Sequence, residues 1–197
     1  MKRLLPTLVM RLLSAVQNFW QDFSYSQHLV DYTPLARLTN LSVLKLSACA
    51  LPTGLWQQLA RTNMPMRSVR HLNIDYCRGT LRALDADHLS SLVKCFPSLV
   101  DLSCVHSTSP NMEWRPLQQL LGLQSLRVSG ISDAYSPVLA SLQHLTKLDI
   151  MAPCSITALG LEKLTDLCQL AYLYIVGNFI DGRSVKEITN KALAGQV

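Results

Sequence analysis

The chain has 197 residues, of which 49% are apolar and 16% are charged. This balance excludes an intrinsically disordered chain and predicts one domain with a substantial buried core. The formal net charge is +5, yet no run of lysines or arginines exceeds two residues. A solvated basic surface is therefore favoured over a nucleic-acid groove, and we expect no nucleic-acid partner.

The chain begins with Met1, Lys2 and Arg3 followed by apolar residues, a pattern that imitates a signal peptide. Arg11 interrupts the apolar run after seven residues. Such a run is at the short end for a signal peptide and too short to span a membrane. We interpret residues 1–34 as a helical cap or a degenerate first repeat. No membrane span is expected, and a cytoplasmic location is favoured over secretion.

A tight apolar pair with one residue between its members recurs six times. The pairs are Leu44/Leu46, Leu72/Ile74, Leu102/Cys104, Leu126/Val128, Leu148/Ile150 and Leu173/Ile175. Their first members are 28, 30, 24, 22 and 25 residues apart. An apolar residue lies three positions before each pair, at Leu41, Val69, Leu99, Leu123, Leu145 and Leu170. A weaker copy of the frame precedes them at Trp20, Phe23 and Tyr25.

Each tight pair predicts a short strand, because residues two apart point to the same face. Helical patterns lie between the pairs, at Leu55–Arg61, His88–Lys94, Pro116–Leu121, Val138–Leu142 and Leu159–Leu167. Pro116 suits a first helical turn, and Pro97 is a stop signal after the second pattern. One strand and one helix cannot bury their apolar faces alone, so the units must stack on one another.

The segments "LTNLSVLKLSACAL" and "LCQLAYLYIVGNFI" resemble the leucine-rich repeat consensus, and the resemblance covers Leu35 to Ile180. "CSITALGLEKLTDLCQLAYLYI" is similar to the cysteine-containing, ribonuclease-inhibitor-like subclass. The resemblance implies an α/β solenoid, a curved horseshoe segment with a parallel sheet on the concave face and helices on the convex face. We expect about six repeats over residues 35–180 and a C-terminal capping helix over 181–197, where Ser184 and Glu187 form a capping box.

In leucine-rich repeats, the residue three places after each pair turns inward, and asparagine or cysteine often fills it. Here the position is held by Cys49, Cys77, Ser107, Ile131, Pro153 and Asn178. The cysteines show no C-x-x-C pair and no close Cys/His spacing, so neither a metal site nor a disulfide framework is favoured. We expect buried free thiols, with Cys104 in a strand of the core.

No catalytic motif is present. The chain lacks G-x-S-x-G, a glycine-rich phosphate loop and H-E-x-x-H. His71 and Asp101 share a register position on neighbouring strands, so we expect them to touch. Without a nucleophile, such a pair is a surface hydrogen bond more often than a catalytic dyad. We predict no enzyme, no cofactor and no metal.

The outward positions of the strands form three rows on the face that a partner would contact. The candidate binding residues are Lys45, His71, Asn73, Asp75, Asp101, Ser103, Arg127, Lys147, Asp149, Tyr172 and Tyr174. Arg127 and Asp149 are expected to form a solvated pair that contributes under about 1 kcal/mol. Tyr172 and Tyr174 either form an interface or pack beneath the C-terminal segment.

The leading hypothesis is a non-enzymatic scaffold that binds another protein or peptide on the concave sheet. One alternative is the substrate-recognition subunit of an SCF-type ubiquitin ligase, since the cysteine-containing subclass is often joined to an F-box. Its partner would be a cullin adaptor, although only Leu5-Pro6 echoes the start of an F-box. The other alternative is a cytoskeletal or axonemal scaffold.

Overall fold

The computed structural model describes residues 33–48, 51, 54–77, 86–106 and 112–176. They belong to the second of two compact units, Tyr32–Val197, whereas the first unit is Met1–Asp31. Several expectations fall outside the described residues: the N-terminal cap, the weaker repeat copy, the F-box echo, the C-terminal capping helix, and Cys49, Ser107 and Asn178.

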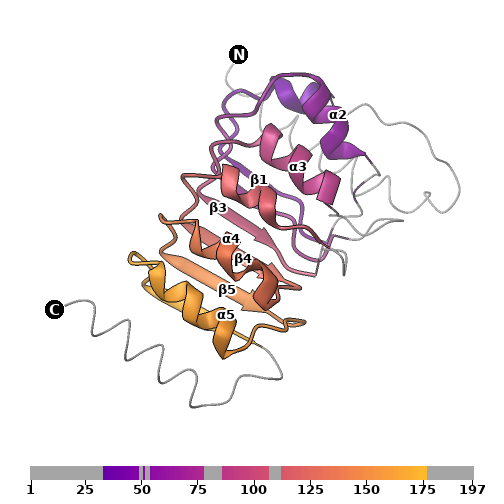
Figure 1. Ribbon diagram of the computed structural model, residues 1–197. Helices are drawn as coiled ribbons and strands as arrows, with labels where there is room; N and C mark the ends of the chain where they lie inside the picture. The colour runs from indigo at the N-terminus through magenta and orange to yellow at the C-terminus, as the bar shows by residue number, and fades with distance from the viewer. Residues whose placement is uncertain (1–32, 49–50, 52–53, 78–85, 107–111, 177–197) are drawn as a thin grey trace, which may run out of the picture. The chain divides into compact units, whose positions relative to one another are not determined.

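Six parallel strands form one sheet in chain order, and Figure 1 shows them stacked along the molecule. The strands are β1 (Val43–Lys45), β2 (His71–Asn73), β3 (Asp101–Cys104), β4 (Ser125–Ser129), β5 (Lys147–Met151) and β6 (Tyr172–Ile175). The first leucine of each tight pair lies opposite the first leucine of the next pair. The strand positions and register predicted from the repeat are therefore confirmed.

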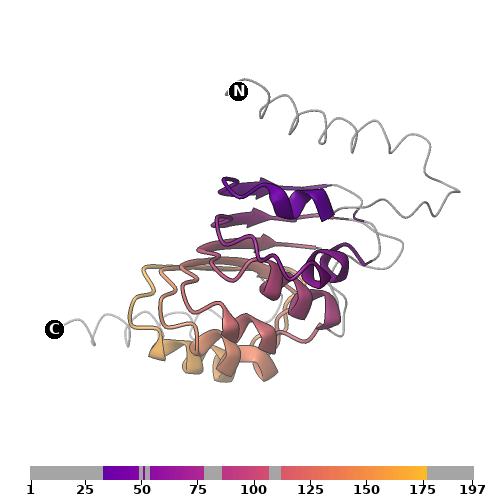
Figure 2. The ribbon, with the colours of Figure 1, turned by 90° about the horizontal axis from the view of Figure 1, so that it is seen from above.

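The helical segments cover one face of this sheet, as Figure 2 shows for α3, α4 and α5. The α-helices are α2 (Leu55–Arg61), α3 (Ala86–Cys95), α4 (Ser136–Ala140) and α5 (Ala158–Glu162). The 3-10 helices are η1 (Thr33–Arg37), η2 (Arg115–Gln119), η3 (Asp133–Tyr135) and η4 (Lys163–Asp166). Two expected helices thus differ in type. The pattern at Pro116 forms η2, and the long pattern ending at Leu167 divides into α5 and η4.

The spacing in threes before each strand is the spacing of a tight turn. The backbone N–H of Leu41 donates to the carbonyl of Leu38, and the same bond recurs at Val69, Leu99, Leu123, Leu145 and Leu170 with N···O distances of 2.9–3.4 Å. Residues three apart in such a turn project to one side. Each repeat therefore directs two apolar side chains inward before its strand begins.

A shared carbonyl links each repeat to the next. The Ser42 oxygen accepts the N–H groups of both Arg70 and His71, at 2.8 and 3.1 Å. The oxygens of Arg70, Val100, Gln124 and Thr146 each accept two N–H groups of the following repeat in the same way. Each strand thus starts at a fixed point relative to its neighbour, which explains why the register holds across repeats of unequal length.

The core lies between the sheet and the helices. Leu102, Leu126 and Leu148 have no exposed surface, and Trp56 and Phe96 pack edge to face at 5.9 Å between ring centroids. Burying each leucine stabilises the fold by roughly 1.5–3 kcal/mol. Burial is lower at the last described strand, where the equivalent leucine, Leu173, is 36% exposed.

Residues with positive φ stand at the same position after four successive strands. They are Ala48 (58°), Tyr76 (56°), His106 (54°) and Gly130 (76°). The left-handed region favours glycine, and a bulky side chain is rare there. The chain therefore leaves the sheet by the same turn in each of these repeats, even where an aromatic residue must adopt it.

Candidate functional site

The open sheet face, meaning the face opposite the helices, carries the first two outward rows in the predicted register. The first row is Val43, His71, Asp101, Ser125, Lys147 and Tyr172, and the second is Lys45, Asn73, Ser103, Arg127, Asp149 and Tyr174. The structure therefore brings the candidate residues of six strands onto one surface.

An outward position on this face does not ensure exposure. Lys45, His71, Lys147, Tyr172 and Tyr174 are exposed, and Asn73, Asp101 and Arg127 are half-buried. Asp75, Ser103 and Asp149 are buried, although we expected them to be accessible. Ser103 bonds to Asp75, and Asp149 lies beside Arg127 and Lys147, so these residues position their neighbours and are not themselves open to a partner.

Asp75 is a buried carboxylate with several donors. Ser103 Oγ lies 2.8 Å from both of its oxygens, and the N–H of Val105 donates to Oδ1 at 2.7 Å. Asn73 Nδ2 and Arg127 Nη1 donate to Oδ2 at 3.3 and 3.4 Å. A buried carboxylate persists only with such partners. Asp75 thereby fixes side chains from three neighbouring repeats.

Arg127 lies between two carboxylates. Its Nε is 4.0 Å from Asp149 Oδ2, and Lys147 Nζ approaches the same oxygen at 3.5 Å. Asp149 is buried, and its Oδ1 has no hydrogen-bond partner. Arg127 and Asp149 therefore face each other as predicted, but the expectation of a solvated pair is wrong for the acid, which is buried. Period-two alternation identified the neighbours but not the burial of the acid. We call Asp75, Arg127, Lys147 and Asp149 the Arg127 cluster.

Two tyrosines continue the Arg127 cluster onto β6. Tyr172 and Tyr174 are 49% and 47% exposed, and the C-terminal segment of the alternative expectation lies outside the described residues. Lys147 Nζ lies 5.0 Å from the centroid of the Tyr172 ring, a cation–π distance. The Tyr172 ring and the Lys147 ammonium therefore hold each other at the surface.

His71 and Asp101 touch as expected. Nδ1 of His71 lies 3.7 Å from Oδ2 of Asp101, and both side chains are close to half exposed. Exposed pairs of this kind contribute about 0–1 kcal/mol. The contact is a surface ion pair when the histidine is protonated.

The thiols of Cys77, Cys95 and Cys104 are buried in the core. Cys77 Sγ donates to the carbonyl of Leu46 in the preceding repeat at 2.9 Å, and Cys104 is fully buried. Burial raises the pKa of the Cys95 thiol to about 12. It also raises the pKa of Cys104, with further contributions from the charges of Asp75 and Cys77. A thiol with a raised pKa is a poor nucleophile.

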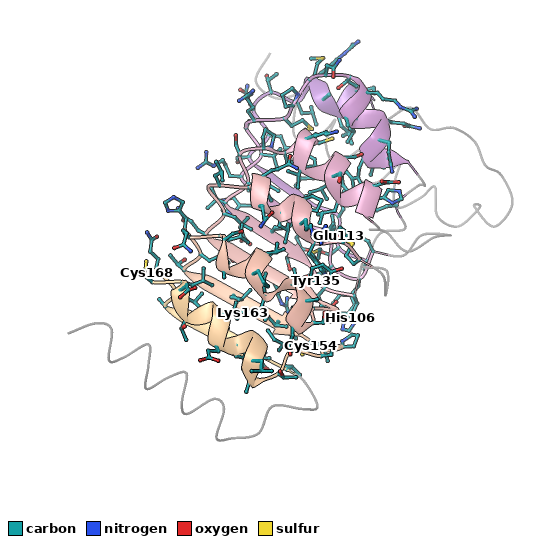
Figure 3. The ribbon with its side chains drawn as sticks, in the orientation of Figure 1. His106, Glu113, Tyr135, Cys154, Lys163 and Cys168 are labelled. Atoms are coloured by element: carbon teal, nitrogen blue, oxygen red, sulfur yellow. The ribbon has the colours of Figure 1, made fainter. Side chains whose placement is uncertain are left out.

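The residue three places after each tight pair was expected to turn inward. Two of the three such residues that the structure describes are buried, as expected. Cys77 and Ile131 are buried there, whereas Pro153 is exposed. Pro153 follows a cis peptide bond with Ala152 and its carbonyl accepts the N–H of Gly130 at 2.6 Å. The thiols of the last described repeat lie nearer the surface, with Cys154 half-buried and Cys168 exposed at opposite ends of that repeat (Figure 3).

Two features escaped the sequence reasoning. The centroids of the Tyr76 and His106 rings lie 5.1 Å apart, just after β2 and β3. The only sign of this contact in the sequence is that both residues stand at the same position after a tight pair. Asp133 links two repeats on the helical side. It accepts the Thr157 N–H at 2.7 Å and the Thr157 hydroxyl at 2.5 Å.

Within the described ranges, no three His, Cys, Asp or Glu side chains gather closely enough to hold a metal ion. The helices of the same residues include none with the length and apolar character required to cross a membrane.

No protein-family model and no curated protein matches this chain. Among solved structures, it is similar to an internalin of Listeria monocytogenes, with a TM-score of 0.53 and 20% identity over 82% of this chain and 42% of that one. A second likeness, to internalin C2 of the same species, has a TM-score of 0.44 and 17% identity over 76% and 68%. The chain spans less than half the length of the first. Internalins are leucine-rich repeat proteins, so the α/β leucine-rich repeat solenoid is confirmed.

Proposed function

We propose that this protein is a non-enzymatic scaffold that binds another protein or peptide on the open sheet face, the concave face of the solenoid. The observation that carries the proposal is the arrangement around Arg127. Two buried carboxylates hold its guanidinium, and two exposed tyrosines lie on β6, beyond the intervening strand β5. Arginine and tyrosine are the residues that most often dominate binding energy at protein interfaces.

This arrangement reduces the entropic cost of binding. A free arginine loses rotamer freedom worth about 0.5–1.5 kcal/mol when a partner immobilises it. Here Asp75 and Asp149 already restrict Arg127, and Lys147 already restricts Tyr172. Six strands make five spacings of about 4.8 Å, or roughly 24 Å, which matches an extended segment of about seven residues.

Placement in the cysteine-containing subclass belongs to the same proposal. The bond from Cys77 to the strand-end carbonyl of Leu46 supports it, because the subclass uses cysteine at that position. We propose a cytoplasmic location as well. The buried free thiols of Cys77, Cys95 and Cys104 suit a reducing compartment.

The test compares proteins captured from a lysate by the parent chain and by a Tyr172→Ala/Tyr174→Ala variant, with quantitative mass spectrometry. Leu159→Ala is the control, because Leu159 is exposed on α5 on the helical side. A partner held by the parent and the control but lost by the tyrosine variant supports the proposal. Equal capture by all three chains refutes it. Recovery of a cullin adaptor or of tubulin would identify which alternative scaffold the chain serves.

A further inference from the structure

The charged groups of the Arg127 cluster differ in what a partner can reach. The side chains of Asp75 and Asp149 are 6% and 9% exposed, whereas those of Arg127 and Lys147 are 39% and 49% exposed. The four formal charges cancel, but the acids are buried and the bases are not. An approaching molecule therefore meets the guanidinium and the ammonium first.

The exposed neighbours of the cluster add further hydrogen-bond donors to this surface. Tyr172 and Tyr174 present phenolic hydroxyl groups, which can donate to a carboxylate, and ring faces on which an apolar group can pack. Tyr174 lies opposite Asp149 in the sheet, and Tyr172 lies opposite Lys147. The donors and the rings thus form one continuous surface across β4, β5 and β6.

We propose that the partner contributes an acidic segment, in which an aspartate or glutamate contacts Arg127 and Lys147 and a neighbouring apolar residue packs on Tyr172 and Tyr174. This inference rests on the proposed binding function and specifies the chemistry of the partner. A carboxylate suits the planar donors of arginine, which bind it in parallel. A basic partner segment would meet the exposed cations and be repelled.

A polyanion such as nucleic acid fits the cluster less well than one carboxylate. Nucleic-acid binding commonly uses 6–10 phosphate contacts, each neutralised by a cation. The cluster offers two cations, and the adjacent carboxylates offset their long-range field. A single acidic side chain can still bind by direct contact with Arg127 and Lys147. The phosphate backbone of a nucleic acid depends on the long-range field, which the carboxylates weaken.

The probe is a phage-displayed library of random dodecapeptides, selected on the purified full chain. We expect enrichment of Asp and Glu in the selected peptides. A synthetic copy of the most enriched peptide is then titrated by fluorescence polarisation. Lys147→Met should weaken its binding about tenfold, a loss of one close ion pair. Lys163→Met makes the same charge change on η4 in the helical layer (Figure 3) and should change binding less than twofold.

Arg127→Lys is the second variant. It keeps the charge between Asp75 and Asp149, so the fold is preserved better than with alanine, and it removes the planar donor pair. We expect it to weaken the acidic peptide at least threefold. A native circular dichroism spectrum and an unfolding midpoint well above the assay temperature for Lys147→Met would show that lost binding is not lost folding.

The outcomes separate this inference from the function on which it rests. Peptides that need Tyr172 and Tyr174 but show no enrichment of Asp or Glu overturn the acidic partner and leave the binding function standing. Peptides rich in Lys or Arg do the same. Peptides whose binding ignores all four side chains, or a selection that enriches nothing, overturn both. Equal competition by a single-stranded oligonucleotide also overturns the acidic partner, because a non-specific polyanion site would explain the data.

Discussion

Gly160 on α5 packs where no side chain fits, and its replacement by alanine tests the contact between neighbouring repeats. A Cβ at this position would overlap Asp133 Oδ1 and would come within 2.7 Å of Ser136 Oγ and 2.8 Å of Ile156 Cγ1. The same Asp133 oxygen accepts the N–H of Thr157. The added methyl group must therefore displace the carboxylate that links the two repeats.

The free-energy terms can be compared. Overpacking costs about 1–3 kcal/mol, and loss of the exposed Thr157 hydrogen bond costs about 1 kcal/mol. Alanine recovers about 1 kcal/mol because it favours the helix over glycine. We expect a net loss of about 2 kcal/mol in the free energy of unfolding, which corresponds to a fall in Tm of roughly 4–8 °C for a domain of this size.

Urea unfolding followed by circular dichroism measures this loss. Gly122→Ala is the matched control, because its Cβ would approach the Leu99 oxygen no closer than 4.0 Å. It should change stability by less than about 0.5 kcal/mol. Adding Asp133→Ala to Gly160→Ala should relieve part of the cost, with a coupling of about 1 kcal/mol. A neutral or stabilising Gly160→Ala would refute the packing described at this contact.

Three further results are expected. Arg127→Met should cost about 1–2 kcal/mol in urea unfolding, since it leaves the buried Asp75 without its cation and Asp149 with Lys147 alone, while the partial exposure of Arg127 limits the loss; a neutral variant would contradict the role of the cluster. Leu148→Ala should cost about 2–5 kcal/mol and Leu173→Ala under about 1.5 kcal/mol, and equal costs would show that another segment covers Leu173. Under native conditions a maleimide should label Cys168 within minutes and leave Cys95 unlabelled. Because the folded pKa of Cys95 is raised to about 12, the folded state retains a proton that the unfolded state loses, so stability should fall as the pH rises above about 9.

The repeat frame could be predicted because two independent periods agree. Apolar residues three apart fit the tight turn, and apolar residues two apart fit the strand. These spacings locate Leu72 and Leu102 and set their register. They depend on local geometry, which the sequence encodes directly.

Burial on the open face could not be predicted in the same way. Alternation shows on which side Asp75 and Asp149 lie, but their exposure depends on whether longer neighbours cover them. Arg127 reaches toward both across the sheet, and no single repeat contains that information. The Tyr76–His106 stack escaped for a different reason. It depends on left-handed backbone at both residues, which sequence patterns assign to glycine.

The unequal repeat lengths have a consequence for how such a chain can change. Successive pairs are between 22 and 30 residues apart, yet every strand pairs with its neighbour without a slip. All variation in length is therefore accommodated in the segments outside the sheet. Insertions there and substitutions on the strands are separable routes of divergence. The first alters the outer surface, and the second alters what the sheet recognises while leaving the spacing of its rows intact.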